Sequence, residues 1–230
     1  MTIGLRRIFS EARAAWREAD AEGRRSVEMF VKELAWREFC ASILESFPRA
    51  ATENFRPEFD RFPWASGETE ERLWGAWATG RTGYPIVDAG IRQLLREGWM
   101  HNRVRMIAAS FLTKDLLVDW RKGEAFFRRH LADGDLASNS GGWQWAAGSG
   151  TDAQPFFRIF NPVLQATRLD PEGVYVRRFL PELKAVKTAR PSEIHAPWEL
   201  ASPPPDYPAP VVDHAAARVR ALAVFKAVRT

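Results

Sequence analysis

Two carboxylates and a downstream amide form the most suggestive chemical cluster in the sequence. Asp133 and Asp135 flank a glycine, and the polar stretch that follows holds Asn139, Trp143 and Trp145. Carboxylates in such a turn accept hydrogen bonds from hydroxyl groups or a heterocyclic N–H. They are also calcium ligands, but no bidentate glutamate follows at the spacing of a calcium loop. Because the two tryptophans are two residues apart, one can face inward and the other a cleft.

A second cluster stands at the start of an otherwise apolar helix. Asn102 and Met106 share one helical face, and two arginines, Arg103 and Arg105, lie between them. This composition suits an anionic ligand near a helix N-terminus, although a solvated helix start explains it equally well. His101 is better explained as structural. No second histidine or cysteine lies at metal-ligand spacing, so we predict no metal site.

A third cluster combines an acid, an indole and a guanidinium. Glu33, Trp36 and Arg37 share a helical face, with Phe30 one turn earlier. Spacing alone favours a partly exposed ion pair beside a core tryptophan over a binding site.

Helical periodicity predicts the elements that position these clusters. Apolar residues recur three and four positions apart, and no stretch alternates with a period of two. We therefore predict an all-α fold. The expected helices cover residues 5–16, 27–34 with Ser26 as the N-cap, 85–98, 104–120, 126–131, 174–180 and 219–226.

Two irregular regions interrupt this pattern. Residues 134–150 are rich in Gly, Ser, Asn and Trp, which indicates either an ordered functional loop or an irregular helix start. Residues 191–210 contain seven prolines and predict an extended strap that leads to a C-terminal helix at about 214–228. We expect residues 1–230 to form one helical domain.

Composition narrows the classes of protein. The 230 residues are 46% apolar and 27% charged, which excludes a disordered chain, and the single cysteine excludes an internal disulfide.

No apolar run approaches the length of a membrane span, and no signal core follows the N-terminal arginines, so we expect a cytoplasmic protein. The net charge of +4 permits a polyanionic partner. The sequence contains ten tryptophans, more than a protein of this length usually has. Some of them pack in the core, and the others suggest a role in stacking or electron transfer.

The clusters lie in segments that together resemble the DNA photolyase/cryptochrome family. The sequence lacks a phosphate-binding glycine loop with lysine, a nucleophile elbow and a dinucleotide fingerprint. The resemblance extends over about residues 5–227. It is carried by the segments 33–39, 80–89, 98–106, 114–120, 133–154, 157–162 and 212–214, with Arg218.

The resemblance implies a light-driven lyase that binds FAD in an all-helical domain and repairs UV-damaged DNA. Flavin is then expected to be held by Phe30, Glu33, Arg37, Trp99, Asn102, Arg105, Phe127, Asp133, Asp135 and Asn139. Within that set, Arg105 is expected to pair with Asp133. Asn139 is expected to face the flavin N5 atom, as in photolyases rather than insect or plant cryptochromes.

The resemblance also implies a lesion site and an electron relay. Trp36 and Trp145 are expected to flank a pyrimidine dimer that has flipped out of the duplex, with Glu33, Asn102 and Met106 beside it. Met106 is typical of the branch that acts on cyclobutane dimers. Trp143, Trp120 and Trp64 are expected to relay an electron to photo-oxidised flavin.

The sequence departs from the family pattern at its N-terminus. The α/β domain that holds an antenna chromophore is absent, so neither folate nor deazaflavin is expected on this chain. A Thr-Ser-x-Leu-Ser-Pro-type segment that grips the FAD phosphates is also absent. We therefore expect the C-terminal part of a photolyase, and a monomer. Three origins fit this expectation: a gene fragment, a split gene whose N-terminal half is separately encoded, or a misplaced start codon. The alternatives are a cryptochrome-like blue-light sensor and a non-catalytic remnant that binds DNA.

Overall fold

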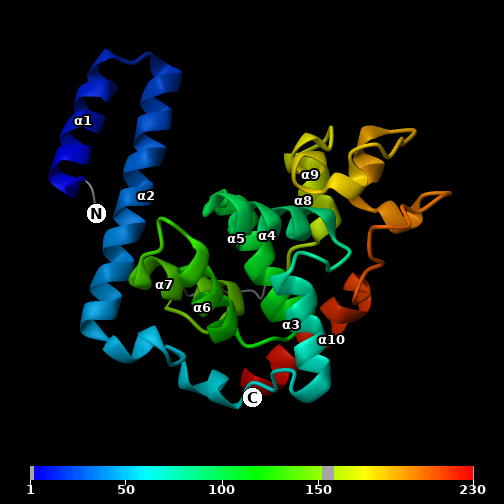
Figure 1. The fold of residues 1–230 in the computed structure, drawn as a ribbon. Coiled ribbons are helices and arrows are strands. Elements are labelled where there is room, and N and C mark those ends of the chain that lie inside the picture. Colours follow the sequence, from blue (N-terminus) through cyan, green and yellow to red (C-terminus); the bar gives the residue numbers. More distant parts are fainter. Residues whose placement is uncertain (1–2, 152–157, 230) are drawn as a thin grey trace.

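The computed structural model describes residues 3–151 and 158–229, and these form helices joined by short turns (Figure 1). No strand occurs in either range, which confirms the predicted all-α class. Residues 152–154 and Phe157, which belong to segments carrying the resemblance, lie outside the described residues. None of the described helices is long and apolar enough to cross a membrane.

Ten α-helices are described in these two ranges. They are α1 (Leu5–Glu18), α2 (Ala21–Ser46), α3 (Gly67–Ala78), α4 (Pro85–Glu97), α5 (Asn102–Ser110), α6 (Trp120–His130), α7 (Leu136–Ala147), α8 (Pro162–Leu169), α9 (Val174–Phe179) and α10 (His214–Arg229). Single helical turns join them: η1 (Pro48–Ala51), η2 (Pro57–Arg61), η3 (Phe111–Asp115), η4 (Pro181–Leu183), η5 (Pro191–His195) and η6 (Pro197–Glu199).

The main core lies where α3, α4, α5, α6 and α7 pack together. Its largest fully buried side chains include Trp77, Trp120, Ile91 and Met100. α1 and α2 form an antiparallel hairpin at the edge of the molecule, with α2 lying against α7 (Figure 1). α10 packs on the η3 turn and brings the C-terminus back to this body.

Helix α4 begins and ends where the sequence predicts. Pro85 occupies its first turn, where the missing N–H removes no helical hydrogen bond. Gly98 terminates it in the left-handed conformation with φ 66°.

Several predicted helix boundaries were wrong: the expected helix 27–34 lies inside α2, which runs to Ser46, and side-chain caps place two helix starts elsewhere. The Asp20 side chain accepts from the Gly23 amide, so α2 begins there and not after Ser26. The expected helix 104–120 ends early: η3 is a π-turn, and the Asp119 side chain caps a new helix that begins at Trp120. That helix, α6, runs to His130, so the expected short helix 126–131 is only its last part.

Polar side chains of α10 bind Asp115 in the η3 turn. His214 Nδ1 contacts the Asp115 carboxylate, and the Arg220 guanidinium donates to the Asp115 carbonyl. Beside them the Lys114 ammonium donates to the Arg158 carbonyl. Lys114 is 5% exposed, and burial lowers the pKa of its amine to about 7.

Candidate functional site

The cavity that is lined by half of the predicted site residues opens between α5, α6 and α7. Its volume is about 180 Å³. Eight of the predicted site residues line it: Asn102, Arg105, Met106, Phe127, Asp133, Asp135, Asn139 and Trp143. The cluster that begins at Asp133 and the cluster that begins at Asn102 therefore meet here, because α5 packs against α7.

The predicted pairing of Arg105 with Asp133 is present. One guanidinium nitrogen of Arg105 lies 2.9 and 3.0 Å from the two Asp133 carboxylate oxygens. The Arg105 Nε donates to the Met100 carbonyl at 2.6 Å, which fixes the guanidinium at the start of α5. The Asp133 side chain is 53% exposed, so the pair contributes little to stability and instead presents two fixed charges to the cavity.

The position of Asn139 follows from the cap of its helix. Asp135 caps α7, and its carboxylate accepts from the Ser138 amide at 2.8 Å. Asn139 lies one turn into the helix, and its Nδ2 donates to both the carbonyl and the carboxylate of Glu124 at 2.9 and 3.0 Å. Both partners are acceptors, so the amide nitrogen must face Glu124 and the amide oxygen is left for the cavity.

Glu124 is a residue that the sequence analysis missed. It is 4% exposed on α6 and also pairs with Arg128 at 3.4 Å. An isolated acidic residue in a helix rich in charges carries no sequence signal. Only the packing of α6 on α7 shows that it holds Asn139.

Trp143 forms the inner wall of the cavity. Its ring packs edge-to-face on Phe127, with centroids 4.9 Å apart. A Cβ at position 123 would lie 2.1 Å from this indole, so only the glycine present there lets α6 approach so closely. The indole N–H is buried and has no hydrogen-bond partner among the described residues.

The predicted relay residues differ in burial. Trp143 and Trp120 are buried, and Trp64 is half-buried against Phe62 at a centroid distance of 4.3 Å. The Trp120 indole donates to Asn54 Oδ1 at 2.9 Å.

A second line of tryptophans leaves Trp143 in another direction. The Trp77 ring lies 6.0 Å from Trp143, and the half-buried Trp74 stacks on Trp77 at 5.5 Å. Neither residue was predicted from the sequence as part of the site. Their three-residue spacing on α3 is a signal that could have been used.

Besides the relay residues Trp64 and Trp120, six further predicted residues lie away from the lining of this cavity. On α2, Phe30 and Trp36 are 50% and 55% exposed, Glu33 is exposed and Arg37 is half-buried. Trp99 is 46% exposed. Trp145 is half-buried and tilted against Phe160, 6.4 Å away, so it diverges from the buried Trp143 as its spacing predicts.

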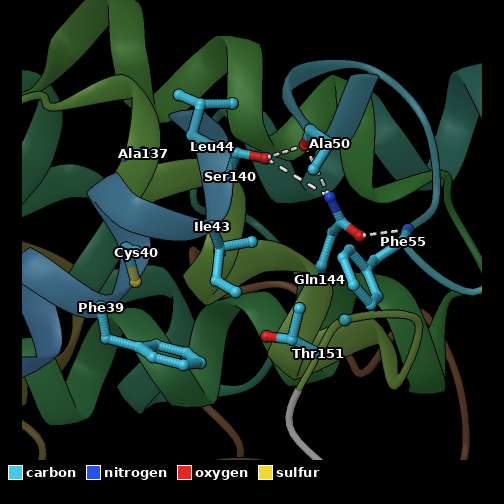
Figure 2. Close-up of a pocket in the computed structure, with 12 residues that line it drawn as sticks. Phe39, Cys40, Ile43, Leu44, Ala50, Phe55, Ala137, Ser140, Gln144 and Thr151 are labelled. Carbon is cyan, nitrogen blue, oxygen red and sulfur yellow. Dashed lines mark hydrogen bonds between the residues drawn. The ribbon is translucent and has the colours of Figure 1, made fainter. Parts of the chain in front are cut away.

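A smaller pocket between α2 and α7 is a structural junction (Figure 2). Gln144 donates to the Ala50 carbonyl at 2.7 Å and accepts from the Phe55 amide at 2.8 Å. The Ser140 hydroxyl donates to the same Ala50 carbonyl. Cys40 also lines this pocket. Burial and the nearby Asp135 raise the pKa of its thiol, so this cysteine is not an activated nucleophile. The hydrogen bonds of Gln144 and Ser140 fix α7, and with it Asn139, relative to η1 and the loop that follows α2.

The described residues include no group of three or more metal-ligating side chains. The chemistry of the cavity rests instead on the Arg105–Asp133 pair, the Asn139 amide and aromatic walls. Such a site suits a planar heterocycle that carries both hydrogen-bond donors and acceptors.

Comparison with known proteins places this site in a described family. Residues 30–227 match the family model of the FAD binding domain of DNA photolyase. The chain is 52% identical over 215 residues to the deoxyribodipyrimidine photo-lyase of Agrobacterium fabrum, covering 88% of this chain and 43% of that protein. It is 50% identical to the Escherichia coli enzyme of the same name, covering 87% and 42%. The chain thus spans less than half the length of these relatives.

Solved structures agree with this similarity. A bacterial class III photolyase from Agrobacterium tumefaciens superposes with a TM-score of 0.85 and 48% identity, over 95% of this chain and 45% of that chain. A cryptochrome from Synechocystis superposes with the same TM-score and 33% identity, over 96% and 46%.

Proposed function

Because the chain belongs to the DNA photolyase family through its FAD-binding domain, we propose that it repairs cyclobutane pyrimidine dimers in UV-damaged DNA as a deoxyribodipyrimidine photo-lyase. The observation that carries this proposal is the cavity in which the Arg105–Asp133 pair, the oriented Asn139 amide and Trp143 meet. The chain contributes the flavin and lesion sites. The remaining part of the enzyme completes the assembly.

The residues of the cavity fit FAD. The Asp133 and Asp135 carboxylates accept hydrogen bonds from hydroxyl and N–H groups, and Arg105 donates to carbonyl oxygens. Met106 and Phe127 supply apolar contact for a ring system. Bound reduced FAD supplies, after it absorbs light, the electron that splits the dimer.

Asn139 adjusts the site toward the reduced form of the ring. Its amide nitrogen is held by Glu124, so the oxygen is the atom that faces the cavity. An oxygen acceptor favours a ring nitrogen that carries hydrogen, which is the reduced state. Phe30, Glu33, Arg37, Trp99 and Asn102 complete the flavin contacts in this proposal.

The lesion site combines α2 with α7. Trp36 and Trp145 stack on a flipped dimer, and Glu33, Asn102 and Met106 contact its base edges and its ring. The exposure of the Trp36 indole supports this role, because a stacking platform must be accessible to DNA. Flipping is easier at a damaged site, where pairing and stacking are already weak.

Trp143 begins the relay that restores reduced flavin. Its contact with the cavity supports this role, and Trp120 and Trp64 continue the relay toward the surface in this proposal. The electron passes inward from Trp64, the outer tryptophan, and an external thiol reductant then reduces the oxidised Trp64.

The test combines the chain with the remaining part of the Agrobacterium relative, FAD and UV-irradiated oligothymidine. Blue light should then remove dimers, and darkness should not. A preparation that binds FAD and dimer-containing DNA but leaves the dimers intact under light would contradict repair. It would instead favour a light sensor, the second candidate that the likeness to the Synechocystis cryptochrome supports.

A further inference from the structure

The helical hairpin of α1 and α2 leaves an apolar seam uncovered. Ala12 is the one buried residue of α1, and none of the 26 residues of α2 is buried. Phe9 of α1 is 52% exposed. A helix normally packs its apolar stripe against another element, and one neighbouring helix covers only part of the stripe here.

The seam contains a groove with the composition of a docking surface. Leu5 and Phe9 of α1 form one side, and Val31, Leu34 and Ala35 of α2 form the other. The groove has a volume of about 370 Å³, and the charged side chains of Arg6 and Glu38 stand beside this apolar floor. An apolar centre with a polar rim is typical of a protein interface.

The far end of the hairpin is fastened independently of any partner. The Trp16 indole donates to Glu28 at 3.2 Å, and the Arg24 guanidinium lies 4.8 Å from the centre of the Trp16 ring. These contacts close the two helices on each other. They leave the open groove as a preformed surface.

The groove is separate from the proposed lesion site. Val31, Leu34, Ala35 and Glu38 follow the i, i+3, i+4, i+7 pattern of one face of α2. At 100° per residue, Glu33 and Trp36 project from roughly the opposite side of the same helix. DNA bound at Trp36 would therefore leave the groove uncovered.

We infer that this groove docks the part of a photolyase that the present chain does not span. The class III photolyase superposes on 95% of this chain, so its fold includes the hairpin, and 55% of that protein (100% minus the 45% matched) lies outside the superposition. A larger protein that shares the hairpin contains enough polypeptide to cover its apolar seam. The inference rests on the proposed function only in that both require this remaining part.

The decisive experiment measures docking without flavin or DNA. The part of the Agrobacterium fabrum relative outside the match is purified and titrated with this chain, and binding is followed by interferometry and light scattering. A one-to-one complex is expected. Phe9→Glu places a charge in the apolar groove and should weaken binding about tenfold or more, because it removes the burial of a large aromatic side chain.

Leu164→Glu is the matched control. Leu164 is an apolar side chain of α8 that is 66% exposed, so the same change there should leave binding unaltered. Circular dichroism should show that both variants keep the helical content of the wild type. Amide hydrogen exchange should slow in α1 and in the first half of α2 when the partner is added.

Two results would overturn the inference. Binding that survives Phe9→Glu unchanged would place the interface elsewhere. Self-association that Phe9→Glu abolishes, with no binding of the remaining part, would assign the groove to a second copy of the chain. Docking without subsequent dimer repair would contradict the proposed function while leaving the inference intact.

Discussion

Asn139 is oriented by Glu124: the amide nitrogen of Asn139 lies 3.0 Å from a Glu124 carboxylate oxygen and 2.9 Å from the Glu124 carbonyl. The pair joins α7 to α6 at the edge of the flavin cavity. It converts an amide that could rotate into a fixed acceptor, because rotation would place the amide oxygen against two other oxygens.

Replacing Glu124 should lower the reduction potential of bound flavin. In Glu124→Leu the Asn139 amide loses one of its two acceptors and can present its nitrogen to the ring, which favours the oxidised form. One hydrogen bond of about 1 kcal/mol corresponds to roughly 20 mV for a two-electron couple. Spectroelectrochemistry of the reconstituted protein measures the shift. Glu124→Gln keeps an acceptor oxygen and should shift the potential less; equal potentials in all three proteins would contradict the role.

Breaking the Arg105–Asp133 pair should affect flavin binding far more than folding. Asp133→Asn removes the charge but keeps the size, and the Asp133 side chain is half exposed, so the unfolding free energy should change by less than about 1 kcal/mol. Flavin retention should fall about tenfold, because Arg105 loses the partner that aims it. Thermal melts of the unbound chain and flavin titrations measure the two effects. A large loss of stability would make the pair structural.

The two rows of tryptophans make separable predictions for photoreduction. Trp143→Phe should abolish photoreduction of oxidised flavin, while repair by chemically reduced flavin survives. Trp120→Phe and Trp77→Phe then test whether Trp120, the next residue of the proposed relay, or Trp77, whose ring lies 6.0 Å from Trp143, supplies the electron. Transient absorption reports the tryptophan radical. If Trp143→Phe also eliminates repair by reduced flavin, the residue acts mainly in packing against Gly123 and Phe127.

The sequence predicted much of this site because its residues are grouped along the chain. Asp133, Asp135, Asn139 and Trp143 lie in one short segment that leads into α7, and Asn102, Arg105 and Met106 lie in the first turns of α5. The sequence left 134–150 ambiguous, because glycine and asparagine disfavour helices. Helix α7 forms there because Asp135 caps it and buried Gln144 and Ser140 bind the Ala50 carbonyl. Those contacts are 94 and 90 residues apart, so local propensity cannot show them.

Lys114 should make stability depend on pH above neutrality. Burial lowers the pKa of its amine from 10.5 to about 7, so between these values the unfolded chain binds more protons than the folded one. The unfolding free energy should therefore rise with pH, by about 2 kcal/mol between pH 7 and 9. Lys114→Met removes this contribution, and other groups titrate alike in both proteins. Chemical denaturation across this range should show the difference; parallel pH profiles would mean that Lys114 is charged in the fold.

Trp36 offers the cleanest test of lesion recognition. The Trp36 indole is 55% exposed and packs edge-to-face on Phe39 at 5.6 Å, so Trp36→Ala should leave folding nearly unchanged. Trp145 is half-buried, and its truncation would also disturb the core. Loss of one stacked base costs roughly 1–3 kcal/mol, so binding of dimer-containing DNA to the assembled protein should weaken about 5- to 100-fold.

Undamaged DNA provides the control for Trp36. It is bound through lysine and arginine contacts with phosphates, which do not involve an indole, so its affinity and its salt dependence should stay the same. Fluorescence anisotropy on matched duplexes measures both. An equal loss on the two DNAs would place Trp36 in the general DNA-binding surface. Unchanged binding to both would remove α2 from the lesion site and leave Trp145 as its sole stacking candidate.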